Sequence, residues 1–289
     1  MAIKRNLPFL SLLFIYLPHG HTAECPSQLI EANKRNTFAL VNHVALDDRP
    51  LKIKTELSSE DNHIHALSRM TFDRCGALIN ATLIQEKNDL SAKGVTTTRT
   101  DFSIRKEDYG WSSVLKMDSE FAEKATSKLN QLFAINSQDL FMLDDRGVFH
   151  KSFGKSEMVI QNKTYPGVAT TLFNWDTDGR LSSVKRMSNI ASDRSNTELT
   201  YDSFGRVIRK ESAAEKEMHQ YDSLGRELSL TKITTYFTTE KTVKTCQQWN
   251  KYGRCILAKQ HMTLTIKNDK RGEENVEEHD AVLKSTYTY

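Results

Sequence analysis

The feature that most constrains the fold of this chain is a short motif that recurs six times. Each copy begins with an aromatic or large apolar residue, continues with Asp or Asn, and has Gly three residues after that Asp or Asn. The copies lie at 72–78 (FDRCGAL), 143–149 (LDDRGVF), 175–181 (WDTDGRL), 201–207 (YDSFGRV), 221–227 (YDSLGRE) and 249–255 (WNKYGRC). Six of the twelve glycines therefore hold one motif position: Gly76, Gly147, Gly179, Gly205, Gly225 and Gly253. Such repetition indicates one small structural unit that is used again along the chain.

The chemistry of the motif predicts a β-hairpin turn. Asp or Asn at the first position of a type I turn accepts a hydrogen bond from the backbone two residues on. Gly supplies the positive φ that starts the returning strand with a bulge, and the Arg that follows is expected to face solvent. We therefore expect Val to destabilise the protein at Gly205 or Gly225, and to be tolerated better at Gly94, outside the motif.

The spacing of the copies predicts an antiparallel meander. Steps of 26, 20 and 28 residues separate Trp175, Tyr201, Tyr221 and Trp249, which leaves room in each step for two strands and two connections. Segments rich in β-formers precede them and predict further strands at 51–57, 63–72 and 77–85.

One segment departs from this pattern. At 118–134, Phe121, Ala125 and Leu129 would share one face of a helix, which predicts a short helical insertion. No linker rich in Pro, Gly or Ser divides the chain. We therefore expect a mainly β protein, an antiparallel hairpin meander forming a single elongated domain over 24–289, with its repeat-rich part at 171–260.

The N-terminus reads as a signal peptide over residues 1–23. Lys4 and Arg5 precede an apolar run of eleven residues at 7–17, and Thr22-Ala23 offers a cleavage site. The run is shorter than the ~20 residues that a membrane-spanning helix needs, so no membrane span is expected. The mature protein is expected to be exported, periplasmic or secreted.

The four cysteines, Cys25, Cys75, Cys246 and Cys255, predict two disulfides in an exported protein. Locality favours Cys246–Cys255, which leaves Cys25–Cys75. The alternation of side chains along a strand opposes the Cys246–Cys255 pairing. In a regular hairpin Trp249 lies opposite Cys255, and Cys246, three residues before Trp249, then points to the other face of the sheet unless a bulge intervenes. The parity argument favours pairing such as Cys75–Cys255. Cys25 is also a candidate for lipidation, although Glu24 directly before it argues against an acylated cysteine.

The search for chemistry predicts no catalytic residue, no cofactor and no metal. Known catalytic and nucleotide-binding motifs are absent from the sequence. His63 and His65 lack a third ligand. Carboxylates such as Asp144 and Asp176 lie in motif turns, where capping explains them. The net charge is +3, or +1 without the leader's Lys4 and Arg5. This charge is too small to indicate a nucleic-acid-binding protein.

Two resemblances follow from these residues. The motif resembles the YD repeats of RHS-type bacterial proteins, whose hairpins coil into continuous β-sheet strips. The chain as a whole is similar to the YnfC-like lipoproteins of enteric bacteria, a family without an assigned activity. The matching segments are 50–52 through 77–78, 173–179, 200–202, 245–246 with Cys255, 265–268 and 287–289. Those lipoproteins carry a lipobox, which residues 22–25 (TAEC) do not match.

Three classes of function remain open. The first is a non-catalytic cell-envelope protein that binds or scaffolds an envelope protein or a glycan through its sheet surface. The second is a cell-wall or carbohydrate hydrolase whose site assembles from distant residues. The third, implied by the RHS resemblance, is a toxin-related shell or neutralising partner, against which the small number of repeats counts. A lipid anchor at Cys25 would place the protein on an envelope membrane.

Overall fold

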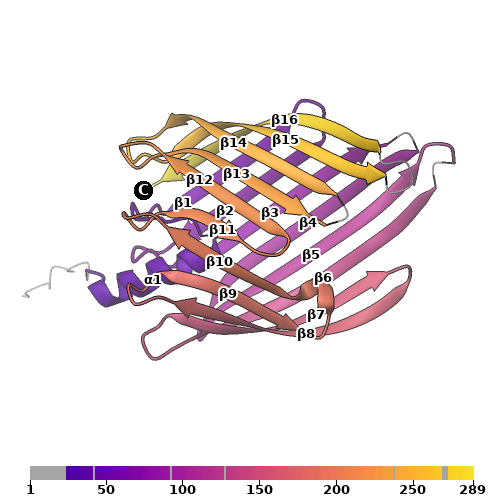
Figure 1. Ribbon diagram of the computed structural model, residues 1–289. Helices are drawn as coiled ribbons and strands as arrows, with labels where there is room; N and C mark the ends of the chain where they lie inside the picture. Colours follow the sequence, from indigo (N-terminus) through magenta and orange to yellow (C-terminus); the bar gives the residue numbers. More distant parts are fainter. Residues whose placement is uncertain (1–23, 42, 92, 127, 237, 269–272) are drawn as a thin grey trace, which may run out of the picture.

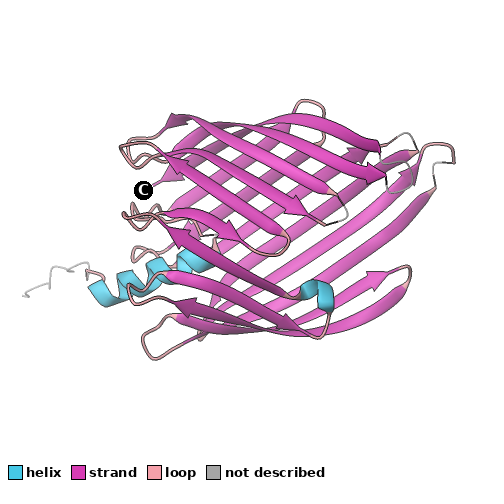
Figure 2. Ribbon diagram, in the orientation of Figure 1, coloured by secondary structure: helices cyan, strands magenta, loops and turns pink. Residues whose placement is uncertain are grey.

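The computed structural model of the chain is an antiparallel β-barrel (Figures 1 and 2). It describes residues 24–41, 43–91, 93–126, 128–236, 238–268 and 273–289, so the expected signal peptide at 1–23 lies outside the described residues. Within them, a helix precedes sixteen strands, and a short 3-10 helix, η1, interrupts the strands.

The first elements are α1 (Ser27–Leu40), β1 (Lys52–Ser59), β2 (Ile64–Phe72), β3 (Leu78–Leu90), β4 (Gly94–Glu107), β5 (Gly110–Glu123), β6 (Leu129–Leu143), β7 (Phe149–Ile160) and β8 (Lys163–Trp175). The remaining elements are β9 (Leu181–Ser188), η1 (Ala191–Asp193), β10 (Ser195–Tyr201), β11 (Val207–Glu211), β12 (Glu215–Tyr221), β13 (Glu227–Thr235), β14 (Thr239–Trp249), β15 (Cys255–Asn268) and β16 (Glu273–Thr288).

Every strand pairs antiparallel with the next, so the expected antiparallel meander is confirmed. The sheet also closes on itself, because β1 pairs with β16 from Lys52 opposite Thr288 to Ser59 opposite Ala281. Closure gives both outer strands a partner and so removes the unpaired strand edges that an open meander would expose.

The six motif copies form hairpin turns at one end of the barrel. Each joins an even-numbered strand to the following odd-numbered one, and Figure 1 shows this end at the left, with α1 and the C-terminus. In the copy at 201–207, the Asp202 Oδ1 atom accepts hydrogen bonds from the backbone N–H groups of Phe204 and Arg206, both at 2.9 Å. Gly205 has a φ of +76°, and the other five motif glycines have φ between +74° and +80°. The turn therefore has the geometry that the motif chemistry predicts.

Successive hairpins are also connected through the motif aromatics. The Tyr201 hydroxyl donates to the Leu181 carbonyl at 2.7 Å, and the Tyr221 hydroxyl donates to the Val207 carbonyl at 2.9 Å. The Arg206 guanidinium lies 4.6 Å from the Tyr221 ring centroid and pairs with Asp202. The expectation that the motif Arg simply faces solvent is therefore wrong, because it bridges its own turn and the next hairpin.

The helix expected at 118–134 is wrong. These residues form the end of β5, a turn, and the start of β6. In β5 the side chains of Leu115 and Met117 are less exposed than that of Lys116 between them, as expected of a strand whose alternate residues face opposite sides. Pairing with β4 and β6 along nearly the whole of β5 overrides a weak helical spacing.

The helix of the structure is α1, whose buried face combines Asn33, Asn36 and Thr37 with Ala32 and Leu40. The Asn36 side chain donates to the Gly147 carbonyl at 2.7 Å and accepts from the Phe149 backbone N–H at 2.9 Å. Thr37 donates to the Gly76 carbonyl at 3.0 Å. These hydrogen bonds give partners to backbone carbonyl and N–H groups of the motif turns, and they fix the helix across the end of the barrel. Because Asn and Thr make up most of this buried face, hydrophobic periodicity does not reveal the helix.

The main core fills the barrel beside α1. It unites Leu40 of the helix with Ile53 of β1 and Leu181 of β9, strands that lie eight apart in the ring of sixteen. Side chains from opposite walls therefore meet in the interior at this end. The alternate residues along each strand face outward.

Candidate functional site

The structure joins Cys25 to Cys75 and Cys246 to Cys255, the pairing that locality favours. The register of β14 and β15 slips at Gln248, which is the irregularity that the parity argument requires for Cys246 to reach Cys255. A sulfur in a disulfide cannot also carry the thioether of a lipid. Lipidation of Cys25 is therefore incompatible with this structure.

The outer wall of the barrel carries exposed charged side chains among its polar and apolar ones. In β1, Lys52, Lys54 and Glu56 are exposed and alternate with the buried core residue Ile53. Exposed outward charges also occur within the other strands, as at Arg99 and Lys259. Such side chains are suited to water.

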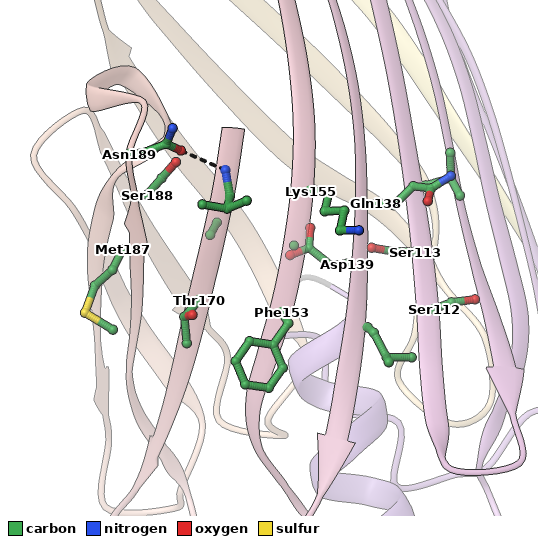
Figure 3. A pocket seen from close by; sticks show the side chains of 15 residues that line it. Ser112, Ser113, Gln138, Asp139, Phe153, Lys155, Thr170, Met187, Ser188 and Asn189 are labelled. Atoms are coloured by element: carbon green, nitrogen blue, oxygen red, sulfur yellow. Dashed lines mark hydrogen bonds between the residues drawn. The ribbon is translucent and has the colours of Figure 1, made fainter. Parts of the chain in front are cut away.

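The wall changes character between β5 and β9, where a groove of about 880 Å³ crosses five strands (Figure 3). Two rows of outward side chains border it, and register places the members of each row opposite one another. The first row, from β5 to β9, is Ser112, Leu140, Phe153, Thr170 and Met187. The second row is Val114, Gln138, Lys155, Val168 and Asn189.

The groove combines exposed apolar side chains with polar ones. Leu140, Phe153 and Met187 are 49%, 46% and 41% exposed. Val168 in the second row is also exposed, and its backbone N–H donates to the Asn189 Oδ1 atom at 2.7 Å, the dashed line in Figure 3. One border of the groove is therefore largely apolar, while the other is mixed.

The floor of the groove consists of a row of residues whose side chains face the interior: Ser113, Asp139, Gly154, Ala169 and Ser188. On the interior side, the Arg186 Nη1 atom donates to Asp139 Oδ1 at 2.7 Å across the strand that carries Gly154. A Cβ atom on Gly154 would lie 2.4 Å from that same Oδ1 atom. Because this ion pair covers the floor from inside, the groove opens to the outside.

The ion pair under the floor is itself stabilised. Arg186 also donates to Asp193 Oδ1 at 2.7 Å and to Thr171 Oγ1 at 3.2 Å. Burial alone would lower the pKa of Arg186, but Asp193 and Asp139 raise it. The guanidinium therefore stays charged and holds β6, β8 and β9 in one arrangement behind the groove.

A second groove on the same wall differs in its chemistry. It crosses β3 to β7, has a volume of about 580 Å³, and is bordered by several charged residues, among them Glu86, Arg99 and Lys116. Arg99 forms ion pairs with Glu86 and Glu120, so its charge is satisfied within the wall. The groove over β5 to β9 thus has fewer charged residues in its lining, Asp139 and Lys155.

The carboxylates considered from the sequence are turn caps in the structure. Asp144 Oδ1 accepts from the backbone N–H groups of Arg146 and Val148, both at 2.9 Å. Asp176 holds the equivalent place in the next copy and pairs with Arg180. These contacts account for both side chains without a catalytic role.

The histidines are dispersed. His219 Nδ1 lies 2.8 Å from Glu227 Oε1, and His261 Nδ1 lies 2.9 Å from Asp280 Oδ1. Burial alone would raise the pKa of Glu227, but His219 and Lys244 lower it to about 2.

His63 and His65, the two histidines considered from the sequence, are separated. His63 is buried and stacks on His279 with ring centroids 3.5 Å apart, whereas His65 is exposed on β2. Among the described residues, no group of three or more His, Cys, Asp or Glu is placed to hold a metal ion.

The motif aromatics do not form an exposed stripe for sugar stacking. Trp175 Nε1 donates to the Phe149 carbonyl at 2.7 Å, and Trp249 Nε1 donates to the Glu227 carbonyl at 3.1 Å. Trp175 and Tyr201 pack against the main core.

Sequence reasoning missed the residues of the outer groove. Leu140 and Phe153 are thirteen residues apart, and Met187 lies further along the chain. Phe153 lies between the outward Lys151 and Lys155, so no local apolar pattern marks it, and only the strand register shows that these residues form one row.

Comparison with known proteins adds a distant likeness. No family model and no curated protein matches the chain. Among solved structures it is similar to a porin-like protein from Bacteroides uniformis, with 12% sequence identity, over 82% of this chain and 97% of that chain, and with a TM-score of 0.42. In the described part of the chain, no helix combines the length and apolarity needed to cross a bilayer. The resemblance to YnfC-like lipoproteins and YD repeats stays a prediction from the sequence.

Proposed function

We propose that this chain is an exported, non-catalytic cell-envelope protein that binds a glycan chain in the groove over β5 to β9. The observation that carries the proposal is the pair of side-chain rows across five strands, with exposed apolar residues in the row from Ser112 to Met187. The two disulfides support export, because such bonds persist in oxidising compartments.

The dimensions of the groove suit an elongated ligand. Five adjacent strands span about 19 Å, and two rows separated by two residues along a strand lie about 7 Å apart. A sugar ring has apolar faces and a hydroxyl-bearing edge. Phe153 offers a ring to such a face, and Gln138 and Lys155 offer polar groups to the hydroxyls.

An extended peptide is the other elongated ligand of this size. Peptides are commonly recognised by strand addition, which requires a free sheet edge. Here β1 and β16 pair with each other, and the segments of β5, β6 and β7 that line the groove are paired on both sides. This favours recognition by side chains, and hence the glycan.

A pelleting assay with purified peptidoglycan sacculi tests the proposal. We expect the wild-type protein to sediment with sacculi, and Phe153→Glu to reduce the bound fraction about tenfold. Ile84→Glu is the matched control, since Ile84 is an exposed apolar residue of the second groove, and it should bind as wild type does. Failure of the wild-type protein to sediment, or equal loss in both variants, would contradict glycan binding in this groove.

The same assay separates binding from hydrolysis. Under the proposal, incubation with sacculi releases no soluble reducing ends above the buffer control. Release that depends on the protein would support the hydrolase alternative and refute the non-catalytic one.

A further inference from the structure

Three neighbouring turns at one end of the barrel carry exposed apolar tips. Phe204, Leu224 and Tyr252 occupy the position directly before the motif glycine in the β10–β11, β12–β13 and β14–β15 turns. Their exposed fractions are 81%, 75% and 46%. We call these three residues the apolar rim.

The turns themselves do not require apolar residues at this position. The corresponding residues in the other three copies are Cys75, Arg146 and Asp178. All six turns nevertheless have the same glycine conformation and the same backbone hydrogen bond from the glycine N–H to the motif Asp or Asn carbonyl. The turn backbone therefore does not require an apolar tip, although the Arg206 guanidinium lies 5.0 Å from the Phe204 ring centroid.

Aromatic and basic side chains accompany the apolar rim. The Tyr252 ring lies 4.3 Å from the Tyr289 ring, and Lys251 Nζ lies 4.9 Å from the Tyr252 centroid. Across the barrel mouth, Tyr109 in the β4–β5 turn is also exposed, and this turn is eight strands away from the β12–β13 turn in the ring of sixteen. Apolar and aromatic tips with neighbouring basic groups are typical of surfaces that enter the interfacial layer of a membrane.

The chain outside the described residues leads to the same end. Cys25 is tied to Cys75 in the β2–β3 turn, so the polypeptide enters the barrel at the end that carries the rim. The apolar run of the leader ends at Leu17, seven residues before Glu24. Seven residues span at most about 25 Å, so while the leader is still attached and held at the membrane, before cleavage, this end of the barrel faces the bilayer.

The spacing of the tips favours a bilayer over a protein as the occupant. Neighbouring tips lie on hairpins two strands apart, or about 10 Å. Side chains so separated form no continuous dry patch of the kind found at the centre of a protein interface. A bilayer accepts each anchor individually. The side wall carries exposed charged side chains such as Lys54 and Lys259, whereas the rim turns carry apolar tips, so the barrel stands on the membrane by its end.

We propose that the apolar rim docks the barrel end-on against the surface of a lipid bilayer, with Phe204, Leu224 and Tyr252 in the interfacial layer. This surface is distinct from the groove, so neither proposal depends on the other.

Vesicle flotation tests the docking. The disulfide-bonded, exported protein, with its N-terminus established by intact mass, is mixed with vesicles of phosphatidylethanolamine and phosphatidylglycerol. We expect wild type to float with the vesicles and the triple variant F204S/L224S/Y252S to lose at least tenfold of the bound fraction. The matched control I84S/L90S/V276S removes three exposed apolar residues that belong neither to the rim nor to the groove over β5 to β9, and it should float as wild type does.

A dye measurement supports the flotation result without relying on the triple variant. An environment-sensitive dye attached through Ser223→Cys, beside Leu224, should shift to the blue on vesicle addition, and a dye at Lys185→Cys on the wall should not. Circular dichroism checks that each variant retains the barrel.

Two results would overturn the proposal. The first is wild-type protein that stays unbound, or a triple variant that floats as well as wild type. The second is a wild-type protein that is oligomeric without lipid while the triple variant is monomeric, which would make the rim a contact between copies of this chain. Sacculus binding by the triple variant should be unchanged, so the two proposals can fail separately.

Discussion

At the residue scale, the motif is a set of contacts that serve two hairpins at once. Asp222 caps its own turn through Oδ1 and pairs with Arg226 through Oδ2 at 2.7 Å. The Arg226 guanidinium lies 4.6 Å from the Trp249 ring of the next copy. In the copy with Asn250 the motif acid is missing, and Arg254 pairs instead with Asp48 from the segment after α1. The repeated residue types thus reflect contacts between neighbouring copies as well as local turn chemistry.

The first prediction concerns the backbone of a motif turn. A Cβ atom on Gly205 would meet no atom within 4 Å, so Val there is opposed only by the φ of +76°. We expect Gly205→Val to lower the free energy of unfolding by about 1–2 kcal/mol. Gly205→Asn should cost less, because Asn adopts positive φ more readily. Urea titration of each variant measures the difference.

The control for this experiment cannot be Gly94. The expectation that Gly94 tolerates Val is wrong, because its Cβ atom would lie 2.0 Å from the Ala122 carbonyl oxygen. Ser203→Val, in the same turn and without positive φ, is a better control. If Gly205→Asn were as costly as Gly205→Val, the explanation by positive φ would be refuted.

At the element scale, α1 is attached to the barrel by turn backbone and by one covalent bond. Asn33 donates to the Cys75 carbonyl at 3.1 Å, one residue from where Thr37 donates to the carbonyl of Gly76. Cys25, two residues before the helix, is bonded to Cys75 itself. The same turn therefore holds the helix by both kinds of contact.

The second prediction compares the two disulfides. They close loops with sequence separations of 50 and 9 residues. If restriction of the unfolded chain dominates, C25S/C75S should lower the unfolding free energy by about 4 kcal/mol and C246S/C255S by about 2.5 kcal/mol. Urea unfolding at neutral pH gives both values.

The matched pair of variants serves as its own control, because each removes two sulfurs. A larger loss on removing Cys246–Cys255 would show that native-state contacts, rather than loop closure, set the contribution of these bonds.

At the scale of the whole molecule, side chains connect parts of the wall that are distant in the ring. Lys87 Nζ of β3 lies 2.6 Å from Glu240 Oε2 of β14, strands that are not neighbours. Burial alone would lower the pKa of Lys87, but Glu240 and Asp89 raise it. Together with the core beside α1, such pairs make the stability of the barrel depend on the interior as well as on the ladder of hydrogen bonds.

The third prediction concerns pH and His43, which follows α1 into the interior. Burial lowers the pKa of His43 from 6.5 to about 3, and the positive charge of Lys210 acts in the same direction. The native state keeps this ring neutral while the unfolded chain protonates it. Its contribution is therefore complete above pH 6.5 and is lost as the pH falls from 6.5 towards 3. Between pH 6.5 and 5 the loss is about 2 kcal/mol.

His43→Asn should remove about 1.4 kcal/mol per pH unit from the slope of stability over that range. Asn is chosen because residue 43 has a φ of +66°. His63, whose pKa burial also lowers, accounts for further slope that His43→Asn leaves in place. A slope identical in wild type and variant would show that His43 does not carry this dependence.

The sequence by itself determined the turns. The positions of Asp202, Gly205 and their equivalents follow from local chemistry, since a side-chain cap and a positive φ involve only a few consecutive residues. The strands flanking these turns, and hence the antiparallel meander, follow for the same reason.

Only the tertiary structure decided the closure of the barrel, the helix and the groove. Pairing of β1 with β16 joins residues more than 220 apart, and nothing in either strand alone specifies that partner. Asn36 and Thr37 of α1 are buried because they donate hydrogen bonds to the carbonyls of Gly147 and Gly76 in two motif turns. The helix sequence alone does not reveal these partners. The groove exists because the register of five strands brings Leu140, Phe153 and Met187 into one row. Each of these features depends on which distant segments become neighbours, and that is fixed by packing rather than by local preference.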